Sequence, residues 1–249
     1  MKDLGWLKHE LIAHRGLHSS DQAIPENSIS SFQYALDKGY AIELDVNLLK
    51  DGTVVVFHDY ELMRAFHDPR RIDELTYEEL NRLYLFDSKE KVPTLEEVLE
   101  LINGQKPVLI ELKPHGNVDE LCHETMKVLN HYVGKYAIFS FHPKVVHILK
   151  KDYPHVIRGQ ISEYFNGQKT MGKIRKYLMK SLFFNRFTKP DFISYGIKDL
   201  PNKYVDKYRN KGLTIISYAA RSQEEFDFVK AHYHNVVFEY FEPKEKALD

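Results

Sequence analysis

The chain has 249 residues, of which 43% are hydrophobic and 29% charged, so it can form a full hydrophobic core and differs from a disordered chain. Lysine and arginine total 35 against 36 acidic residues, and this balance argues against nucleic-acid binding, which usually requires a basic excess. The single cysteine, Cys122, excludes an intramolecular disulfide and a cysteine-built zinc site. Residues 1–9 lack a long apolar run and no run of about 18 apolar residues follows, so we expect a cytoplasmic protein without a signal peptide or membrane span.

Short runs rich in β-forming residues alternate along the chain with longer segments of helical periodicity. Apolar residues recur at helical spacing, for example, over 29–36 and 95–102. Alternation of this kind predicts βα units, a mostly parallel sheet and, without a Gly/Pro/Ser-rich linker, a single domain over 1–249. The nine predicted strands are Leu11–Gly16, Ala41–Leu48, Val54–Asp59, Pro107–Lys113, Ala137–Phe141, Val156–Ile161, Asp191–Tyr195, Leu213–Tyr218 and Val236–Tyr240.

One of these nine strands is expected to be antiparallel. Between Asp45 and Val54 there is no room for a parallel crossover, and Asp51-Gly52 suits a two-residue type I′ hairpin. Centring the turn there places His58 opposite Asp45. Eight parallel strands remain, and at this length they predict an α/β fold of the (β/α)8 TIM type with a β-hairpin after the second strand.

Polar residues occur at the ends of successive predicted strands. In a (β/α)8 barrel the carboxyl ends of the strands meet at one rim, where active sites lie. Alternation along a strand places Glu43 and Asp45 on one face, and Glu111 and Lys113 on another strand likewise share a face. The residues expected to converge are His14, Arg15, Glu43, Asp45, His58, Glu111 and Lys113.

These residue types favour metal-assisted phosphodiester cleavage. Carboxylates without cysteine suit one Mg²⁺ or Ca²⁺ ion rather than zinc, so Glu43, Asp45 and Glu111 are the predicted metal ligands. His14 and His58 can divide acid and base duties near neutral pH. The predicted phosphate contacts are Arg15 and Lys113, whose positive charges suit an anionic substrate. A structural role as an ion-pair partner is the alternative for Lys113.

Further substrate-binding candidates are Asn27, Phe141, Tyr195 and Tyr218. Asn27 precedes the first helical segment, so its alternative role is that of a helix N-cap. The three aromatic residues follow or end strands and could line an alcohol pocket, although aromatic residues at such positions often serve packing alone.

Several motifs together resemble the glycerophosphodiester phosphodiesterase family. They are His14-Arg15-Gly16, Pro25-Glu26-Asn27-Ser28, Glu43-Leu44-Asp45-Val46, Asp51-Gly52-Thr53-Val54-Val55-Val56-Phe57-His58-Asp59 and Glu111-Leu112-Lys113. The resemblance implies a TIM-type barrel with a small insertion near 60–94, an acid/base pair at His14 and His58, divalent-metal ligands at Glu43, Asp45 and Glu111, and phosphate contacts at Arg15 and Lys113.

The same resemblance implies an activity, the hydrolysis of glycerophosphodiesters to an alcohol and glycerol 3-phosphate in lipid and glycerol metabolism. By analogy with phosphoinositide-specific phospholipases, the glycerol hydroxyl of the substrate attacks phosphorus first. Which histidine is the acid and which the base stays open. The chain departs from the family pattern at 63–66, 216–219 and 237–242, which leaves the alcohol pocket and its headgroup undefined.

A basic segment lies outside this constellation. Residues 169–189 contain seven lysines and arginines and no acid, and apolar residues recur there at helical spacing. We favour an outer barrel helix with a solvated charged face, and the alternative is a basic amphipathic helix in weak contact with an anionic membrane surface.

Two rival functions follow from the same residues. The first is a lysophospholipase D-type lipid phosphodiesterase that acts at a membrane surface through the same site. The second is a catalytically silent barrel that binds phosphodiesters. The predicted partner in the main hypothesis is a small-molecule phosphodiester and not a nucleic acid.

Overall fold

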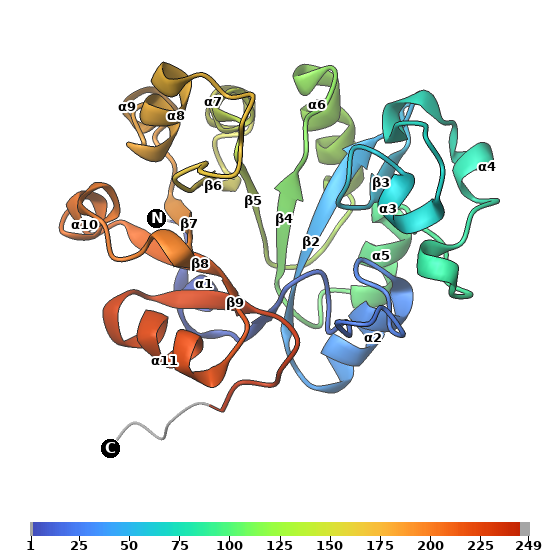
Figure 1. Ribbon diagram of the computed structural model, residues 1–249, viewed down its shortest axis with the longest axis horizontal. Helices are drawn as coiled ribbons and strands as arrows, with labels where there is room; N and C mark the ends of the chain where they lie inside the picture. The colour runs from blue at the N-terminus through green and yellow to red at the C-terminus, as the bar shows by residue number, and fades with distance from the viewer. Residues whose placement is uncertain (1, 245–249) are drawn as a thin grey trace. The chain divides into compact units, whose positions relative to one another are not determined.

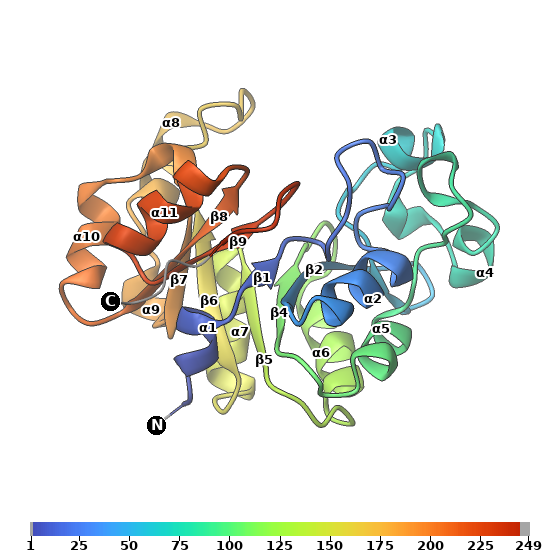
Figure 2. The ribbon, with the colours of Figure 1, turned by 90° about the horizontal axis from the view of Figure 1, so that it is seen from below.

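The computed structural model describes residues 2–244, which divide into two compact units. The N-terminal unit is Ala13–Phe139, and the C-terminal unit combines residues 2–12 with residues 140–244. The elements of both units follow one another along the chain as alternating strands and helices (Figures 1 and 2).

In the N-terminal unit, strand pairing brings two acidic strand segments side by side. β2 (Ala41–Leu48) pairs in parallel with β4 (Val108–Leu112), which pairs in parallel with β5 (Tyr136–Ser140). β1 (Ile12–Ala13) also pairs with β2, and β3 (Val54–Val56) is antiparallel to it. In this register Asp45 lies opposite Glu111. The helices between these strands are α2 (Ile29–Asp37), α5 (Leu95–Ile102) and α6 (Val118–Leu129).

The helix boundaries of this unit follow from capping residues. Ser28 accepts a hydrogen bond from the backbone N–H of Ser31 and starts α2, and Thr94 does the same from Glu97 for α5. The apolar stripe of α5 is buried as its periodicity predicts, and it comprises Leu95, Val98, Leu99 and Ile102.

The C-terminal unit repeats the parallel arrangement. β6 (Ile157–Ser162), β7 (Phe192–Gly196), β8 (Thr214–Ala220) and β9 (Asn235–Phe238) pair in parallel in that order. Its helices are α1 (Gly5–His9), α7 (Pro143–Asp152), α8 (Lys173–Lys180), α9 (Asn185–Thr188), the 3₁₀ turn η3 (Ile197–Asp199), α10 (Lys203–Arg209) and α11 (Gln223–His232).

Each of the nine predicted strands corresponds to a strand in the structure. With β3 set aside as the hairpin partner, eight strands remain, and helical segments follow them along the chain in the βα pattern. The predicted (β/α)8 TIM-type fold is confirmed. That residues 1–249 form a single domain stays a prediction.

The segment between β3 and α5 is the predicted insertion. It contains α3 (Met63–Phe66), η1 (Ile72–Glu74), α4 (Tyr77–Leu80) and η2 (Leu85–Asp87). Buried apolar side chains from this segment, among them Leu62, Ile72, Leu75 and Leu80, pack with Val55 of β3 and Phe57 just after it. The insertion therefore has a small core of its own that continues from the hairpin.

The hairpin between β2 and β3 differs from its prediction by one residue. Gly52 donates its N–H to the carbonyl of Leu49 and has a φ of 86°, whereas Asp51 is not in the left-handed region. A three-residue loop of this kind, with a glycine bulge, replaces the predicted type I′ turn. The extra residue shifts the register, so Phe57 rather than His58 lies opposite Asp45, and Phe57 donates its N–H to the Asp45 carbonyl.

The basic segment 169–189 does not form one helix. α8 ends at Lys180, Leu182 takes a left-handed conformation with a φ of 57°, and α9 begins at Asn185. The left-handed residue interrupts the helix, which the apolar spacing alone did not reveal. Among residues 2–244, no helix combines the length and apolar character that crossing a membrane requires.

Candidate active site

Three carboxylates gather on the adjacent strands β2 and β4. Glu43 and Asp45 project from the same face of β2, and the parallel register brings Glu111 of β4 beside them. One oxygen from each of the three lies within 4.8 Å of the others, and all three side chains are buried. The predicted convergence of these acids is present in the structure.

Two cationic side chains partly neutralise the three acids. Arg15 places its Nε 3.3 Å from Asp45 Oδ2 and donates its backbone N–H to Glu43 Oε2. The ammonium of Lys113 lies 3.1 Å from Asp45 Oδ1 and 2.9 Å from Glu111 Oε1. Charges buried this deeply require partners, and two cations face three carboxylates.

The pKa values in the cluster reflect this imbalance. Burial raises the pKa of Glu43 well above its usual value, and the nearby Asp45 and Glu111 raise it further. Burial also raises the pKa of Glu111. Burial acts on Asp45 in the same sense, but Lys113, His58 and Arg15 together lower the pKa of Asp45 below its ordinary value. Electrostatic repulsion thus remains at Glu43 and Glu111.

A divalent cation fits this donor set. The ligand atoms are all carboxylate oxygens, which Mg²⁺ and Ca²⁺ prefer, and a positive ion would offset the burial and the repulsion that together raise the pKa of Glu43. Glu43, Asp45 and Glu111 could therefore hold a metal ion.

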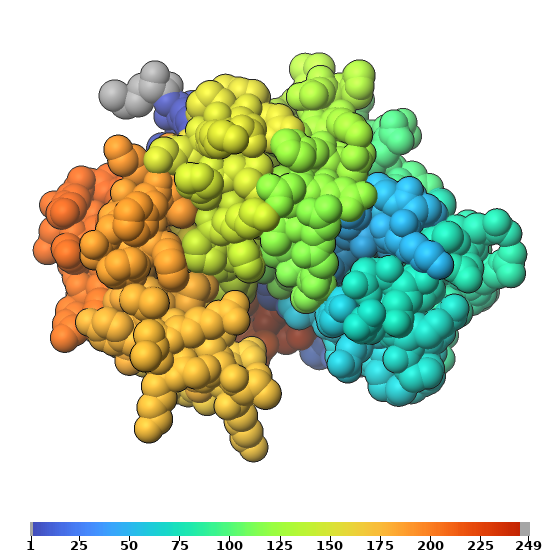
Figure 3. All heavy atoms as spheres, turned by 90° about the horizontal axis from the view of Figure 1, so that it is seen from above, coloured from blue at the N-terminus to red at the C-terminus, as the bar shows by residue number. Residues whose placement is uncertain are grey.

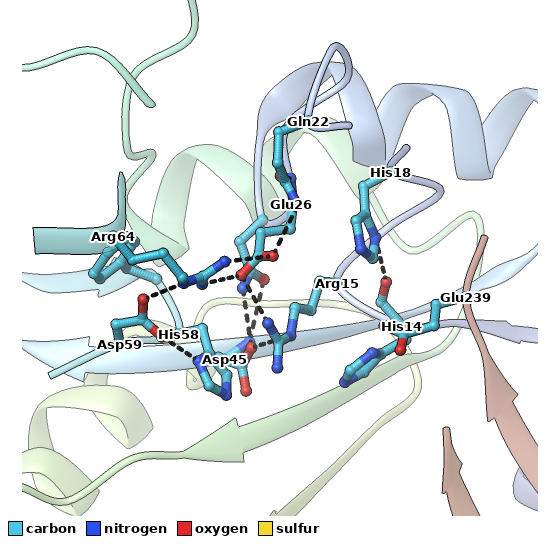
Figure 4. A network of polar contacts seen from close by, with 12 residues as sticks. His14, Arg15, His18, Gln22, Glu26, Asp45, His58, Asp59, Arg64 and Glu239 are labelled. Carbon is cyan, nitrogen blue, oxygen red and sulfur yellow. Dashed lines mark hydrogen bonds and ion pairs between the residues drawn. The ribbon is translucent and has the colours of Figure 1, made fainter. Parts of the chain in front are cut away.

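Both predicted acid/base histidines lie at this cluster. His14 follows β1, and its Nε2 lies 3.8 Å from Glu43 Oε2. His58 follows β3 and reaches the cluster from the loop rather than by cross-strand pairing, with its ring beside Asp45 in Figure 4. Burial and the charge of Lys113 lower the pKa of His58, which favours the neutral imidazole near pH 7.

Asp59 orients the ring of His58. Its Oδ1 lies 2.6 Å from Nδ1 of His58. An ionised carboxylate can only accept a hydrogen bond, and burial is outweighed at Asp59 by His58 and Arg64, which lower its pKa. Nδ1 of His58 therefore carries the proton, and in the neutral ring Nε2 is the basic atom.

Arg64, in α3 of the insertion, extends this contact into a network (Figure 4). It donates through Nε to Asp59 Oδ2 and through Nη2 to Glu26 Oε1, each at 2.6 Å. Glu26 Oε1 also accepts a hydrogen bond from Arg15 Nη1 at 2.7 Å. Hydrogen bonds and ion pairs thus connect His58, through Asp59, Arg64 and Glu26, to Arg15.

No role for Arg64 or Glu26 was predicted from the sequence. Glu26 belongs to a motif that the resemblance includes, but its ion pairs with two arginines depend on how the insertion folds. Burial alone would raise the pKa of Glu26, whereas its hydrogen bonds with Arg64 and the positive charges of both arginines lower it to about 2. A sequence signal for these long-range ion pairs is absent.

Asn27 lies in the site and is not the helix cap. Its Nδ2 donates to Asp45 Oδ2 at 2.9 Å, and its Oδ1 accepts from the backbone N–H of Asp45. The cap of α2 is Ser28, so the alternative N-cap role of Asn27 is wrong. Its φ of 55° is in the left-handed region, which asparagine tolerates better than most residues.

The three aromatic candidates belong to the C-terminal unit. Phe141 and Tyr218 are half-buried and pack edge to face, with ring centroids 5.9 Å apart, and the Tyr218 hydroxyl donates to the carbonyl of Ser162. Tyr195 is fully buried in the core of this unit, and its hydroxyl donates to the carbonyl of Lys180. The contacts of Tyr195 are those of a packing residue.

A further histidine near Lys113 has no counterpart in the sequence predictions. His115 stacks on Tyr60 of the insertion with ring centroids 4.3 Å apart, and the Tyr60 hydroxyl donates to Asp73 Oδ2. Lys113, Asp73 and His115 line a cavity of about 260 Å³. Burial and the charge of Lys113 lower the pKa of His115 to about 4.

The fold and site together define a (β/α)8 protein with three buried carboxylates on the adjacent strands β2 and β4. The family model of the glycerophosphoryl diester phosphodiesterase family matches residues 14–238. The chain belongs to this family, as its motifs predict.

Named relatives and solved structures agree with this assignment. The chain is 36% identical over 163 residues to a glycerophosphodiester phosphodiesterase of Caldanaerobacter subterraneus subsp. tengcongensis and 31% identical over 159 residues to one of Bacillus altitudinis. These matches cover 60% and 59% of this chain and 65% and 64% of the relatives, just under two thirds of their length. A phosphodiesterase of Oleispira antarctica, solved with the product sn-glycerol-3-phosphate, shares the fold with a TM-score of 0.78 at 23% identity, covering 94% of each chain.

The paired arginines at Glu26 lead to a stability prediction. Glu26→Gln removes the charge that Arg15 and Arg64 share, and we expect the free energy of unfolding at pH 7 to fall by about 3 kcal/mol. Because the pKa of Glu26 is lowered from 4.5 to about 2, its contribution is complete above about pH 4.5 and is lost as the pH falls toward 2. Urea denaturation at pH 7 and pH 3 measures the difference between wild type and variant, which should shrink at pH 3.

Glu78→Gln is the matched control. Glu78 pairs with Arg82, but both side chains are mostly exposed, so its removal should change stability by less than about 0.5 kcal/mol at either pH. Equal losses in the two variants, or a Glu26→Gln effect that is the same at pH 7 and pH 3, would contradict the assigned role of Glu26.

Proposed function

We propose that the protein is a metal-dependent enzyme that hydrolyses glycerophosphodiesters to an alcohol and glycerol 3-phosphate. The observation that carries this proposal is the meeting of three buried carboxylates, two histidines and two cations within one unit, on β2 and β4 and in the segments that follow β1, β3 and β4. Membership of the family supports it. A cytoplasmic role in lipid and glycerol metabolism accompanies this proposal.

The proposed cofactor is one divalent cation, Mg²⁺ or Ca²⁺, held by Glu43, Asp45 and Glu111. When bound, it supplies positive charge that polarises the phosphoryl group. Asn27 supports this set because its amide fixes one oxygen and the backbone N–H of Asp45.

Arg15 and Lys113 are the proposed phosphate-binding residues. Both already face the acidic cluster, and Glu26 holds the guanidinium of Arg15 in place from its far side. An ion that shares the carboxylates would free part of their positive charge for the phosphate oxygens of the substrate. Phe141 and Tyr218 belong to the C-terminal unit, where their rings pack together, and a role for them in substrate binding stays a prediction, whereas Tyr195 packs in the core of that unit.

The two imidazoles divide the proton transfers. In the first step the glycerol hydroxyl attacks phosphorus and gives its proton to one imidazole, while the other protonates the departing alcohol oxygen and a cyclic phosphate forms. In the second step the roles reverse: water attacks phosphorus, loses a proton to the second imidazole, and the ring oxygen takes a proton from the first. Glycerol 3-phosphate results, and both histidines return to their starting states.

A product assay tests the proposed function against its two rivals. Release of glycerol 3-phosphate from soluble glycerophosphocholine and related diesters, with Mg²⁺ or Ca²⁺ present, is the expected result. Turnover of a lysolipid in vesicles with none of the soluble diesters would favour the lysophospholipase D-type alternative. Absence of metal-stimulated hydrolysis across the whole panel would overturn the proposal in favour of a silent phosphodiester-binding barrel.

Replacing either histidine should abolish most turnover without unfolding the protein. We expect His14→Ala and His58→Ala each to lower kcat by about 10²–10⁴-fold, because general acid–base catalysis contributes in that range. Initial rates with glycerophosphocholine measure the effect, and circular dichroism checks the fold. His131→Ala, an exposed histidine of the same unit, is the control and should retain wild-type rates. Near-normal turnover in both active-site variants would refute their roles.

Asp59 should act through His58 and not through substrate binding. In Asp59→Asn, the amide NH₂ can donate to Nδ1 of His58 and favour the wrong tautomer, so we expect kcat to fall at least about tenfold with little change in KM. Asp59→Glu, which keeps the acceptor, should recover part of the rate. A change in KM alone would show that Asp59 contacts the substrate instead.

Metal binding should be measurable without turnover. Addition of Mg²⁺ or Ca²⁺ to chelator-treated protein should raise its Tm, because a ligand that binds only the folded state stabilises it. Glu111→Gln should reduce this shift, whereas Glu120→Gln, an exposed residue of α6, should leave it unchanged. An equal Tm shift in Glu111→Gln and wild type would place the ion elsewhere.

A further inference from the structure

The C-terminal unit presents a concentrated basic surface. Residues 169–189 carry seven lysines and arginines and no acid, although the whole chain has a formal charge of −1. In Figure 3 the gold-coloured surface of this segment carries side chains that project away from the neighbouring atoms. Positive charge is therefore gathered on one surface of an otherwise slightly acidic chain.

Apolar side chains stand among these cations instead of facing the core. On α8, Ile174 is 79% exposed and Tyr177 is 55% exposed, and Phe187 of α9 is 54% exposed. Ile174 and Tyr177 are three residues apart and so are neighbours on the helix surface, and Lys173 lies four residues before Tyr177. Exposed apolar and aromatic residues beside lysines are typical of surfaces that lie in the interface of a lipid bilayer.

An apolar pocket opens beside the same segment. Its volume is about 450 Å³, and Pro143, Met179, Phe184 and Phe187 form its apolar wall. This volume falls within the range of about 300–1,000 Å³ that is common for small-ligand sites. Leu182, in the left-handed conformation, lies between α8 and α9, and Phe184 and Phe187 follow it to line the pocket.

Basic groups surround this pocket. Arg175, Lys144 and His142 line it together with the apolar side chains. Burial lowers the pKa of His142, and the charges of Arg175 and Lys144 lower it further, so three basic groups lie close together. A pocket with apolar walls and cations at its edge matches a ligand with a hydrocarbon chain and an anionic head.

The underlying elements are fixed firmly enough to present such a surface. Ser162 Oγ on β6 donates to the carbonyl of Met179, and Tyr195 on β7 donates to the carbonyl of Lys180. The C-terminal end of α8 is thus hydrogen-bonded to two strands. In α9, Arg186 lies 3.9 Å from the centroid of the Phe183 ring and adds a cation–π contact.

We propose that α8 and α9 bind the surface of an anionic lipid bilayer, with the pocket beside them receiving one acyl chain. The lysines and arginines contact anionic headgroups, and Ile174, Tyr177 and Phe187 enter the interface. This inference does not rest on the proposed function, because it uses only the surface of the C-terminal unit.

Co-sedimentation of the full chain with vesicles tests the inference. Vesicles of phosphatidylcholine alone are compared with vesicles that contain about one third phosphatidylglycerol, at low and at high salt. We expect binding to the anionic vesicles at least about tenfold tighter than to the neutral ones, weakened by salt. Equal affinity for both kinds of vesicle, or no binding to either, would overturn the proposal.

Two sets of variants separate charge from apolar insertion. Lys173→Gln/Arg175→Gln/Lys176→Gln should weaken vesicle binding about tenfold or more, and Ile174→Gln/Tyr177→Gln should weaken it at unchanged charge. The matched controls are Lys203→Gln/Lys207→Gln/Lys211→Gln, three exposed lysines of the same unit, and Tyr84→Gln/Val133→Gln, two exposed residues of the other unit. Loss of binding in the controls equal to that in the α8 variants would count against this surface.

The same binding measurement with duplex DNA tests whether the surface binds any polyanion. If duplex DNA binds as tightly as the anionic vesicles and Ile174→Gln/Tyr177→Gln changes neither affinity, the surface is a general polyanion site and the lipid proposal is wrong.

Turnover of soluble glycerophosphocholine should be unchanged in the α8 variants, so loss of vesicle binding with full turnover separates this inference from the proposed function.

Discussion

The burial of three carboxylates on two adjacent strands is the constraint on which the rest of the site depends. Glu43, Asp45 and Glu111 lie within 4.8 Å of one another and are almost inaccessible to water. Such a cluster is costly unless positive charge surrounds it, and Arg15 and Lys113 supply only part of that charge. Burial, together with the charges of Asp45 and Glu111, raises the pKa of Glu43, so a cation at this cluster would stabilise its ionised form.

Residues around the cluster continue the pairing of opposite charges away from it. Arg15 reaches both Asp45 and Glu26, and Arg64 reaches both Glu26 and Asp59. Opposite charges therefore alternate from the acidic cluster to the imidazole of His58. Because each of the intervening residues has a partner on two sides, the positions of His58 and Arg15 are linked through this series of contacts.

Much of the N-terminal unit was predictable, since its strands are continuous apolar runs interrupted by acids at spacing two. The register of the hairpin was not, because Asp51-Gly52 is compatible with both a two-residue and a three-residue loop and the choice shifts every pairing by one. Arg64 escaped prediction for another reason. Its partners are 5 and 38 residues away, and only the folded insertion brings them together. The left-handed backbone of Leu182 could not be predicted either, since leucine ordinarily continues a helix.

The shared carboxylate of Glu26 has a consequence for how this barrel tolerates loop exchange. A graft that replaced residues 60–94 with a loop from another barrel would leave every metal-ligand candidate in its native sequence. It would also delete Arg64. Glu26 would then keep Arg15 as its only guanidinium partner, and Asp59 would lose its ion pair with Arg64. A transplanted loop would therefore preserve these ion pairs only if it placed an arginine at the position of Arg64, so the insertion helps to set the positions of Glu26 and Asp59 beside the carboxylate cluster.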